Sequence, residues 1–142
     1  KTNTIVYSQF KAGFIDFSRW IIQNQQMFDK ALMCVENSNL SNRTFDMRGS
    51  KLVIARKSRD VGKNQAISQN VVDLCQSLGF SVIEMSPKGK GNKWNHSTLE
   101  QVLNDEKLIP DTNRTNQDKR DACKLALIAY KRPYLAKQSK IF

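Results

Sequence analysis

The chain has 142 residues and a formal net charge of +10 at pH 7, with 39% hydrophobic and 25% charged residues. This length suits one domain and leaves no room for a second sizeable core, and the composition argues against global disorder. The sequence shows no apolar run of the roughly 18 residues that cross a bilayer, and no secretory signal layout. The cationic surplus favours a polyanionic partner, although a basic protein without such a partner remains the alternative.

Hydrophobic spacing predicts alternating strands and helices. In chain order we expect a strand at 4–10, a helix at 14–28, a strand at 31–37, a surface loop at 38–62, a helix from about Lys63 that stops at Gly79, a strand at 81–85, a basic loop at 87–96, a short helix at 97–106, a turn at 110–114 and a final helix that opens with a capping box at 115–118. This alternation predicts one layered α/β domain with a largely parallel centre, over residues 1–130, followed by a basic tail at 131–142. The three cysteines form no C-x-x-C pair, which favours reduced core thiols and a cytosolic compartment.

Two acids open the final helix. Asp118 shares its helical face with Ala122 and Leu125, and Asp121 lies one turn after Asp118. Two neighbouring carboxylates at the head of an apolar stripe repel each other unless a positive charge lies between them, and a divalent cation would supply it. The alternative is that Asp118 only caps the helix and Asp121 meets a basic neighbour. The spacing by itself favours neither.

A third acid, Glu36, ends the apolar run at 31–35, and open α/β sheets place functional groups at the carboxyl ends of central strands. Its alternative is a strand-end side chain that points into solvent. Glu84 occupies a similar position in the next strand and ranks lower, because its run is shorter and begins with Ser. Two or three carboxylates without a His or Cys cluster suit Mg²⁺ or Mn²⁺ rather than zinc.

Basic residues gather in the loops between these elements. We expect one cluster to bind phosphate at the start of a helix, and a second to track a nucleic-acid backbone while Trp94 stacks on a base. A solvated loop with Trp94 packed inward is the alternative. His96, the only histidine, suits a surface or phosphate contact better than a general base. The candidate nucleic-acid contacts are Lys57, Arg59, Lys63, Lys88, Lys90, Lys93, Trp94, Arg114, Lys119, Arg120 and Lys124.

Four segments, VENSNLSNRTF, VGKNQAISQNVVDLCQSLGF, SVIEMSPKGKGNKW and RTNQDKRDACKLALIAY, resemble in order and spacing the RuvC-like branch of the RNase H-like superfamily. The resemblance covers most of residues 3–130 and implies a central mixed sheet flanked by helices. It also implies that Glu36, Asp118 and Asp121 are catalytic metal ligands. The family's first strand, which bears another Asp, has no counterpart, because Asp16 falls on the following helix. We therefore expect two further strands before Lys1.

The same resemblance implies an activity. The family resolves four-way (Holliday) DNA junctions, cutting opposite strands as a homodimer with two Mg²⁺ or Mn²⁺ ions about 4 Å apart, in the cytoplasm or, for a phage protein, in that of its host. Lys119, Arg120 and Lys124 are candidates by position for stabilising charge at the cleaved phosphate. Another RNase H-like nuclease and a catalytically silent nucleic-acid-binding module remain open. A small-molecule α/β enzyme is disfavoured because the sequence contains no Gly-rich phosphate loop.

Overall fold

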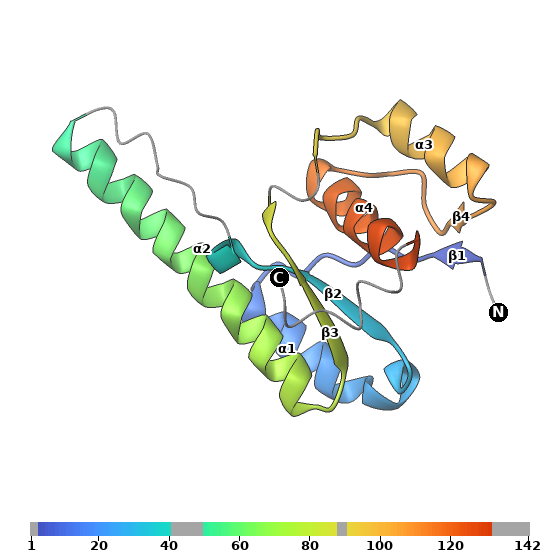
Figure 1. Ribbon diagram of the computed structural model, residues 1–142, viewed down its shortest axis with the longest axis horizontal. Helices are drawn as coiled ribbons and strands as arrows, with labels where there is room; N and C mark the ends of the chain where they lie inside the picture. Colours follow the sequence, from blue (N-terminus) through green and yellow to red (C-terminus); the bar gives the residue numbers. More distant parts are fainter. Residues whose placement is uncertain (1–2, 41–49, 88–90, 132–142) are drawn as a thin grey trace.

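Figure 1 shows the computed structural model of the protein, which describes residues 3–40, 50–87 and 91–131. Strands and helices alternate along the chain. Their bounds are β1 Thr4–Ile5, α1 Phe14–Gln23, the 3₁₀ turn η1 Gln25–Phe28, β2 Leu32–Glu36, the 3₁₀ turn η2 Ser38–Leu40, α2 Lys51–Ser77, β3 Ser81–Met85, α3 His96–Asp105, β4 Ile109–Pro110 and α4 Gln117–Lys131. Most of the expected elements are therefore present, with shifted ends.

The described strands form two separate parallel pairs rather than one central mixed sheet. β2 pairs with β3 from Leu32 opposite Ser81 to Glu36 opposite Met85. β1 pairs with β4 over two residues only. The strand expected at 4–10 is much shorter, because the chain leaves β1 after Ile5 and carries Phe10 into ring contacts with Phe17 and Trp20. The parallel pairing agrees with the sequence prediction, whereas a single sheet is not seen in the described part of the chain.

Two apolar clusters lie on different sides of the molecule. The first packs α1 and α2 against one face of β2 and β3, and its buried centre is Val72, Cys75 and Val82. The second packs α3 and α4 together with residues around β1, and its buried centre is Leu99, Leu103, Cys123 and Leu127. Because α4 also contacts β2, it connects the two clusters and carries the face that matters for the site.

The start of α2 differs more from the sequence prediction than the bounds of any other described helix. It begins at Lys51, twelve residues before the expected start, and the Ser50 side chain caps it by accepting a hydrogen bond from Val53 N (3.3 Å). The segment contains no proline, and Gly62 weakens a helix by only about 1 kcal/mol, too little to break it. Its end is as expected, because Gly79 has φ +86° and closes a Schellman motif with Phe80. Neither α2 nor any other described helix is long and apolar enough to cross a membrane.

Candidate functional site

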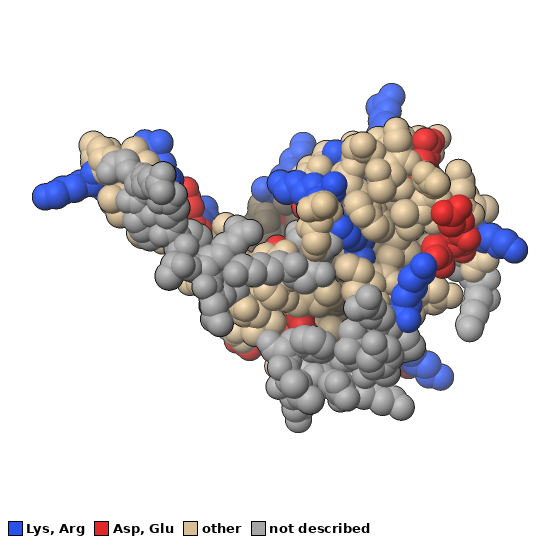
Figure 2. All heavy atoms as spheres, turned by 45° about the horizontal axis from the view of Figure 1, so that its top comes forward, with Lys and Arg blue, Asp and Glu red and all other residues tan. Residues whose placement is uncertain are grey.

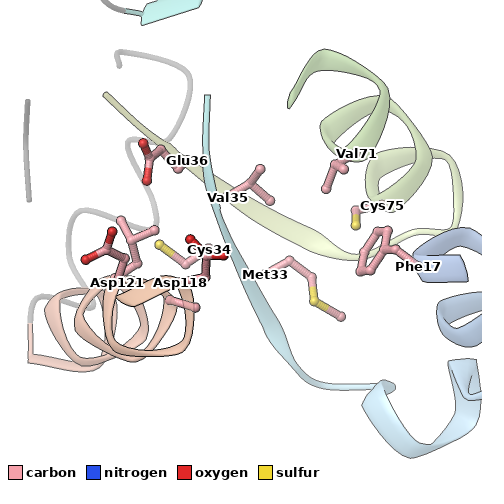
Figure 3. A pocket seen from close by; sticks show the side chains of 11 residues that line it. Phe17, Met33, Cys34, Val35, Glu36, Val71, Cys75, Asp118 and Asp121 are labelled. Carbon is pink, nitrogen blue, oxygen red and sulfur yellow. The ribbon is translucent and has the colours of Figure 1, made fainter. Parts of the chain in front are cut away.

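One cavity of about 490 Å³ is lined by all three acids that the sequence analysis singled out. Glu36 comes from the end of β2, whereas Asp118 and Asp121 come from the first turns of α4 (Figure 3). Met33, Cys34 and Val35 of β2 also line the cavity. Ala122 and Leu125 extend its α4 wall, and side chains from α1 and α2 complete it, namely Phe17, Val71 and Cys75. The structure therefore brings together residues that are more than 80 positions apart in the chain.

Strand alternation puts Glu36, which lines the cavity, and Glu84, which does not, on opposite faces of the β2–β3 pair. Successive strand residues point to opposite faces of a sheet, and Val35, which packs with the α1–α2 cluster, is the register partner of Glu84. Glu84 therefore lies on the α2 side, where its Oε1 accepts a hydrogen bond from Asn37 Nδ2 (2.7 Å). Glu36 lies one position later, on the side of α4. This supports the higher rank that the sequence gives Glu36.

Asn37 is a residue that the sequence analysis missed. It is only 1% exposed, and its side chain connects three elements at the carboxyl end of β2. Its Oδ1 accepts from Asn39 N (3.0 Å) and Asn39 Nδ2 (2.8 Å), while its Nδ2 donates to Glu84 and, at 3.4 Å, to Gln69 Oε1. Its backbone N–H donates to Met85 O (2.9 Å). Asn37 thus fixes the backbone directly after Glu36. The signal available in the sequence was an Asn at the end of a strand, a typical turn residue.

The start of α4 differs from the expected capping box. Asn116 is the capping residue, because its Oδ1 accepts from Lys119 N (2.9 Å). Asp118 therefore does not cap the helix, which weakens one alternative explanation for it, and its side chain is exposed at the cavity. Asp121 is partly buried and accepts a hydrogen bond from Gln117 Nε2 (2.7 Å). Both carboxylates lie in the first turns, where the helix dipole favours negative charge.

The donor set of the cavity suits a hard divalent cation, but the arrangement is open. Three carboxylates are the ligands that Mg²⁺ and Mn²⁺ prefer. Burial raises the pKa of the Cys34 thiol to about 11, so that it stays protonated near neutral pH and supplies no thiolate ligand. Nevertheless, among the described residues no three His, Cys, Asp or Glu side chains converge closely enough to hold a metal ion as they stand. Binding would need the carboxylates to move together.

Two of the expected substrate contacts on α4 point into the protein instead. Arg120 Nε donates to Trp94 O (3.0 Å), and its other nitrogens bind Thr115 and Gln117. Lys124 is 7% exposed, donates to Asn92 O and lies 4.9 Å from the centre of the Trp94 ring. Trp94 itself packs against the α3–α4 cluster. Trp94, Arg120 and Lys124 together hold the loop at 91–95 against α4. This agrees with the alternative in which Trp94 packs inward. The three residues therefore do not belong to the proposed nucleic-acid surface.

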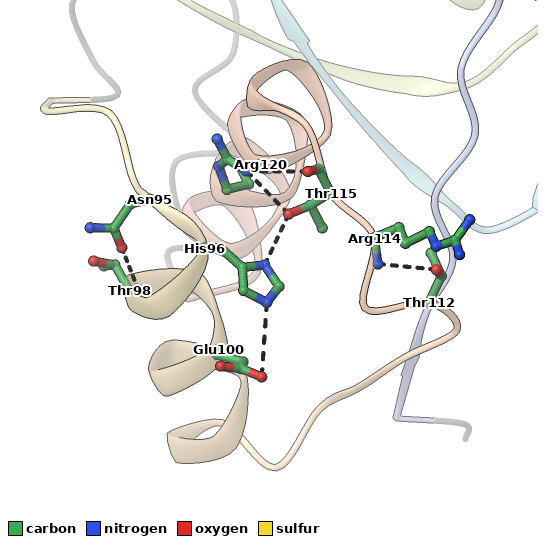
Figure 4. A network of polar contacts seen from close by, with 8 residues as sticks. All are labelled: Asn95, His96, Thr98, Glu100, Thr112, Arg114, Thr115 and Arg120. Atoms are coloured by element: carbon green, nitrogen blue, oxygen red, sulfur yellow. Dashed lines mark hydrogen bonds and ion pairs between the residues drawn. The ribbon is translucent and has the colours of Figure 1, made fainter.

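His96, Arg114 and Lys119 border a second, polar hollow of about 450 Å³ between the starts of α3 and α4. His96 is the first residue of α3 rather than a loop residue, and its Nδ1 lies 3.2 Å from Thr115 Oγ1 (Figure 4). Its Nε2 lies 3.9 Å from Glu100 Oε1. These contacts orient the ring within the protein, while Arg114 remains exposed.

The remaining basic candidates fall into two groups. Lys57, Arg59 and Lys63 lie inside α2 and not at its start, so the expected binding of phosphate by free backbone N–H groups does not apply to them. Lys93 is exposed beside Trp94, whereas Lys88 and Lys90 lie outside the described residues. The basic tail does so as well, except for Lys131, which ends α4 and pairs with Glu106.

Comparisons with family models, with curated proteins and with solved structures find no match to this chain.

Proposed function

We propose that the protein is a metal-dependent endonuclease that cleaves branched DNA, of the four-way junction type. One observation carries the proposal: Glu36, Asp118 and Asp121 come from two elements far apart in the chain and line one cavity. The cavity gathers three carboxylates on a chain whose net charge of +10 favours a polyanionic partner. Carboxylates beside a phosphodiester make chemical sense when a cation lies between them.

Under this proposal each element has a defined task. The end of β2, locked by Asn37, holds Glu36, and the first turns of α4 present Asp118 and Asp121 from the other side. When bound, Mg²⁺ or Mn²⁺ would activate the attacking water and stabilise charge on the leaving oxygen. The exposed cations Lys93 and Arg114 and the partly buried Lys119 would hold the DNA backbone.

The substrate class and the assembly follow from the resemblance to RuvC-like resolvases. A four-way junction offers two equivalent strands, and a homodimer with twofold symmetry would present two sites to them. Paired symmetric cuts are therefore the expected product pattern.

The test is Mg²⁺-dependent cleavage of a synthetic four-way junction, with linear duplex and an RNA–DNA hybrid as comparisons. We expect Asp121→Asn and Glu36→Gln to lower the cleavage rate at least about a hundredfold, because each removes a metal-ligand charge. Glu84→Gln is the matched control: it removes the same charge on the other face of the sheet, and its amide oxygen can still accept from Asn37. Equal loss of activity in all three variants would contradict the assignment of the site. Preferential cutting of the hybrid would identify another RNase H-like nuclease.

A second candidate is a catalytically silent nucleic-acid-binding module. The observation that favours it is the open arrangement of the acids, which as they stand do not form a metal-holding group among the described residues. Such a module would bind the junction tightly without metal and cleave none of the three substrates.

A further inference from the structure

The N-terminal half of α2 projects from the body of the protein. Figure 1 shows this end of the helix extending away from the sheet, and nearly all residues from 51 to 64 are exposed. The segment from Lys51 to Lys63 contains five basic residues and a single acid, Asp60. Lys and Arg side chains gather on this projecting end in Figure 2.

The helix sorts these cations by face. Arg56, Arg59 and Lys63 are spaced by three and four residues, so they form one line along the helix. Val72, which is buried against the sheet, lies sixteen positions beyond Arg56, or about 160° around the helix. The line therefore runs along the outer face, opposite the core. We call Arg56, Arg59 and Lys63 the basic stripe.

Two hydrogen bonds between α2 and the end of β2 fix the position of the basic stripe along the helix axis relative to the acidic cavity. Ser38 N donates to Ser68 Oγ (3.4 Å), and Asn37 Nδ2 reaches Gln69 Oε1, so the end of β2 lies level with residues 68 and 69 of α2. Lys63 lies five residues before Ser68, and Arg56 lies twelve before it. At 1.5 Å per residue the stripe extends from about 8 to about 18 Å beyond the carboxyl edge of the strands.

We infer that the basic stripe is a second binding surface for the phosphate backbone of duplex DNA, separate from the acidic cavity. It would contact a duplex arm roughly two to five base pairs away from the level of Glu36, given a rise of about 3.4 Å per base pair. The inference rests on the proposed function for its substrate. The cavity touches Val71 and Cys75 on the core side of α2, whereas the stripe lies on the outer face, so the stripe would contact a different arm of the branched DNA from the one held at the cavity. Arginine suits such a surface, since its guanidinium binds phosphate in a bidentate manner.

The test measures binding without metal, so that it does not depend on cleavage. The triple variant Arg56→Gln, Arg59→Gln, Lys63→Gln is compared with a control triple, Lys11→Gln, Arg19→Gln, Lys30→Gln, which removes the same charge from exposed positions outside α2. The probe is a four-way junction in EDTA, titrated at several salt concentrations. We expect the stripe variant to weaken binding at least about tenfold and to reduce the salt slope by about 2.7, at about 0.9 per phosphate contact. The control triple should change the slope much less.

Arm length gives a second readout. Junctions with arms closed by hairpin loops after about 4 or about 12 base pairs differ in whether duplex reaches Arg56. The native protein and the control triple should prefer the long arms, and the stripe variant should lose that extra preference. The inference is wrong if both triples lower affinity and salt slope equally, or if the stripe variant keeps the preference for long arms. It is also wrong if the stripe variant binds DNA normally and instead loses binding to vesicles that contain phosphatidylserine.

Cleavage by the native protein separates this inference from the proposed function. Absence of cleavage together with loss of binding in the stripe variant would refute the nuclease and support the stripe. Cleavage by the native protein together with unchanged binding in the stripe variant would support the nuclease and refute the stripe.

Discussion

Replacement of Asn37 tests whether the buried amide fixes the end of β2. Asn37→Ala removes the donor to Glu84 and the acceptor for both Asn39 groups, at a position only 1% exposed. A hydrogen bond to a charged group contributes about 1.5–3 kcal/mol, and a neutral one about 1 kcal/mol. We therefore expect the free energy of unfolding to fall by about 3 kcal/mol, which lowers Tm by about 10 °C in a chain of this length.

Asn37→Asp gives a sharper test because it keeps the size of the side chain. The introduced carboxyl can still accept from Asn39, but it places an oxygen where Nδ2 lies 2.7 Å from Glu84 Oε1. The pKa of the introduced carboxyl in the folded state should rise above its unfolded value near 4. A raised folded pKa means that stability is present below the unfolded pKa and is lost as the pH rises through the folded pKa.

Urea unfolding at pH 4.5 and pH 7.5 measures this effect. The difference in unfolding free energy between the native protein and Asn37→Asp should be larger at pH 7.5. An equal difference at the two pH values, or a loss below about 0.5 kcal/mol for Asn37→Ala, would refute the reasoning. If Asn37 also positions Glu36, both variants should lower junction cleavage at temperatures where they remain folded.

Three further predictions concern other parts of the chain. Gly62→Ala should stabilise the protein by about 0.4–1 kcal/mol, because an added Cβ in this helix interior meets nothing within 4 Å. Gly79→Ala should destabilise it by about 1 kcal/mol, because the backbone there has φ +86°. Equal effects of the two substitutions in urea unfolding would contradict the backbone argument. Lys107 has φ +56° after α3, so Lys107→Gly should raise the unfolding free energy by about 0.5–1 kcal/mol, and a loss would show that the lysine side chain matters more than the backbone. Alkylation of Cys34 at pH 8 should be about a hundredfold slower than that of a free cysteine and should accelerate up to about pH 11, as followed by mass spectrometry; fast labelling at pH 8 would contradict the burial of this thiol.

Local patterns in the sequence were sufficient for much of the secondary structure. The strand expected at 81–85 is β3 with the same bounds, and the helix expected at 97–106 is α3 shifted by one residue. The predicted stop at Gly79 is confirmed by its Schellman hydrogen bonds. These signals depend on side-chain alternation and on backbone freedom at one residue, so they can be read without knowing what packs nearby. The start of α2 could not be predicted in this way, because Ser and Gly, here Ser50 and Gly62, are as common in loops as at the caps or weak points of helices.

The sequence by itself determined which acids were candidates, because carboxylates at a strand end and at a helix start are visible in the chain. Only the tertiary structure shows that Glu36 lines a cavity with the two α4 acids while Glu84 does not, since one position of register sends a side chain to the α4 face or to the α2 face of the sheet. It also turned Arg120 and Lys124 inward while lining up Arg56, Arg59 and Lys63 along an exposed helix face. The physical reason is that the role of a charged residue depends on the groups that surround it, and those groups come from distant parts of the chain.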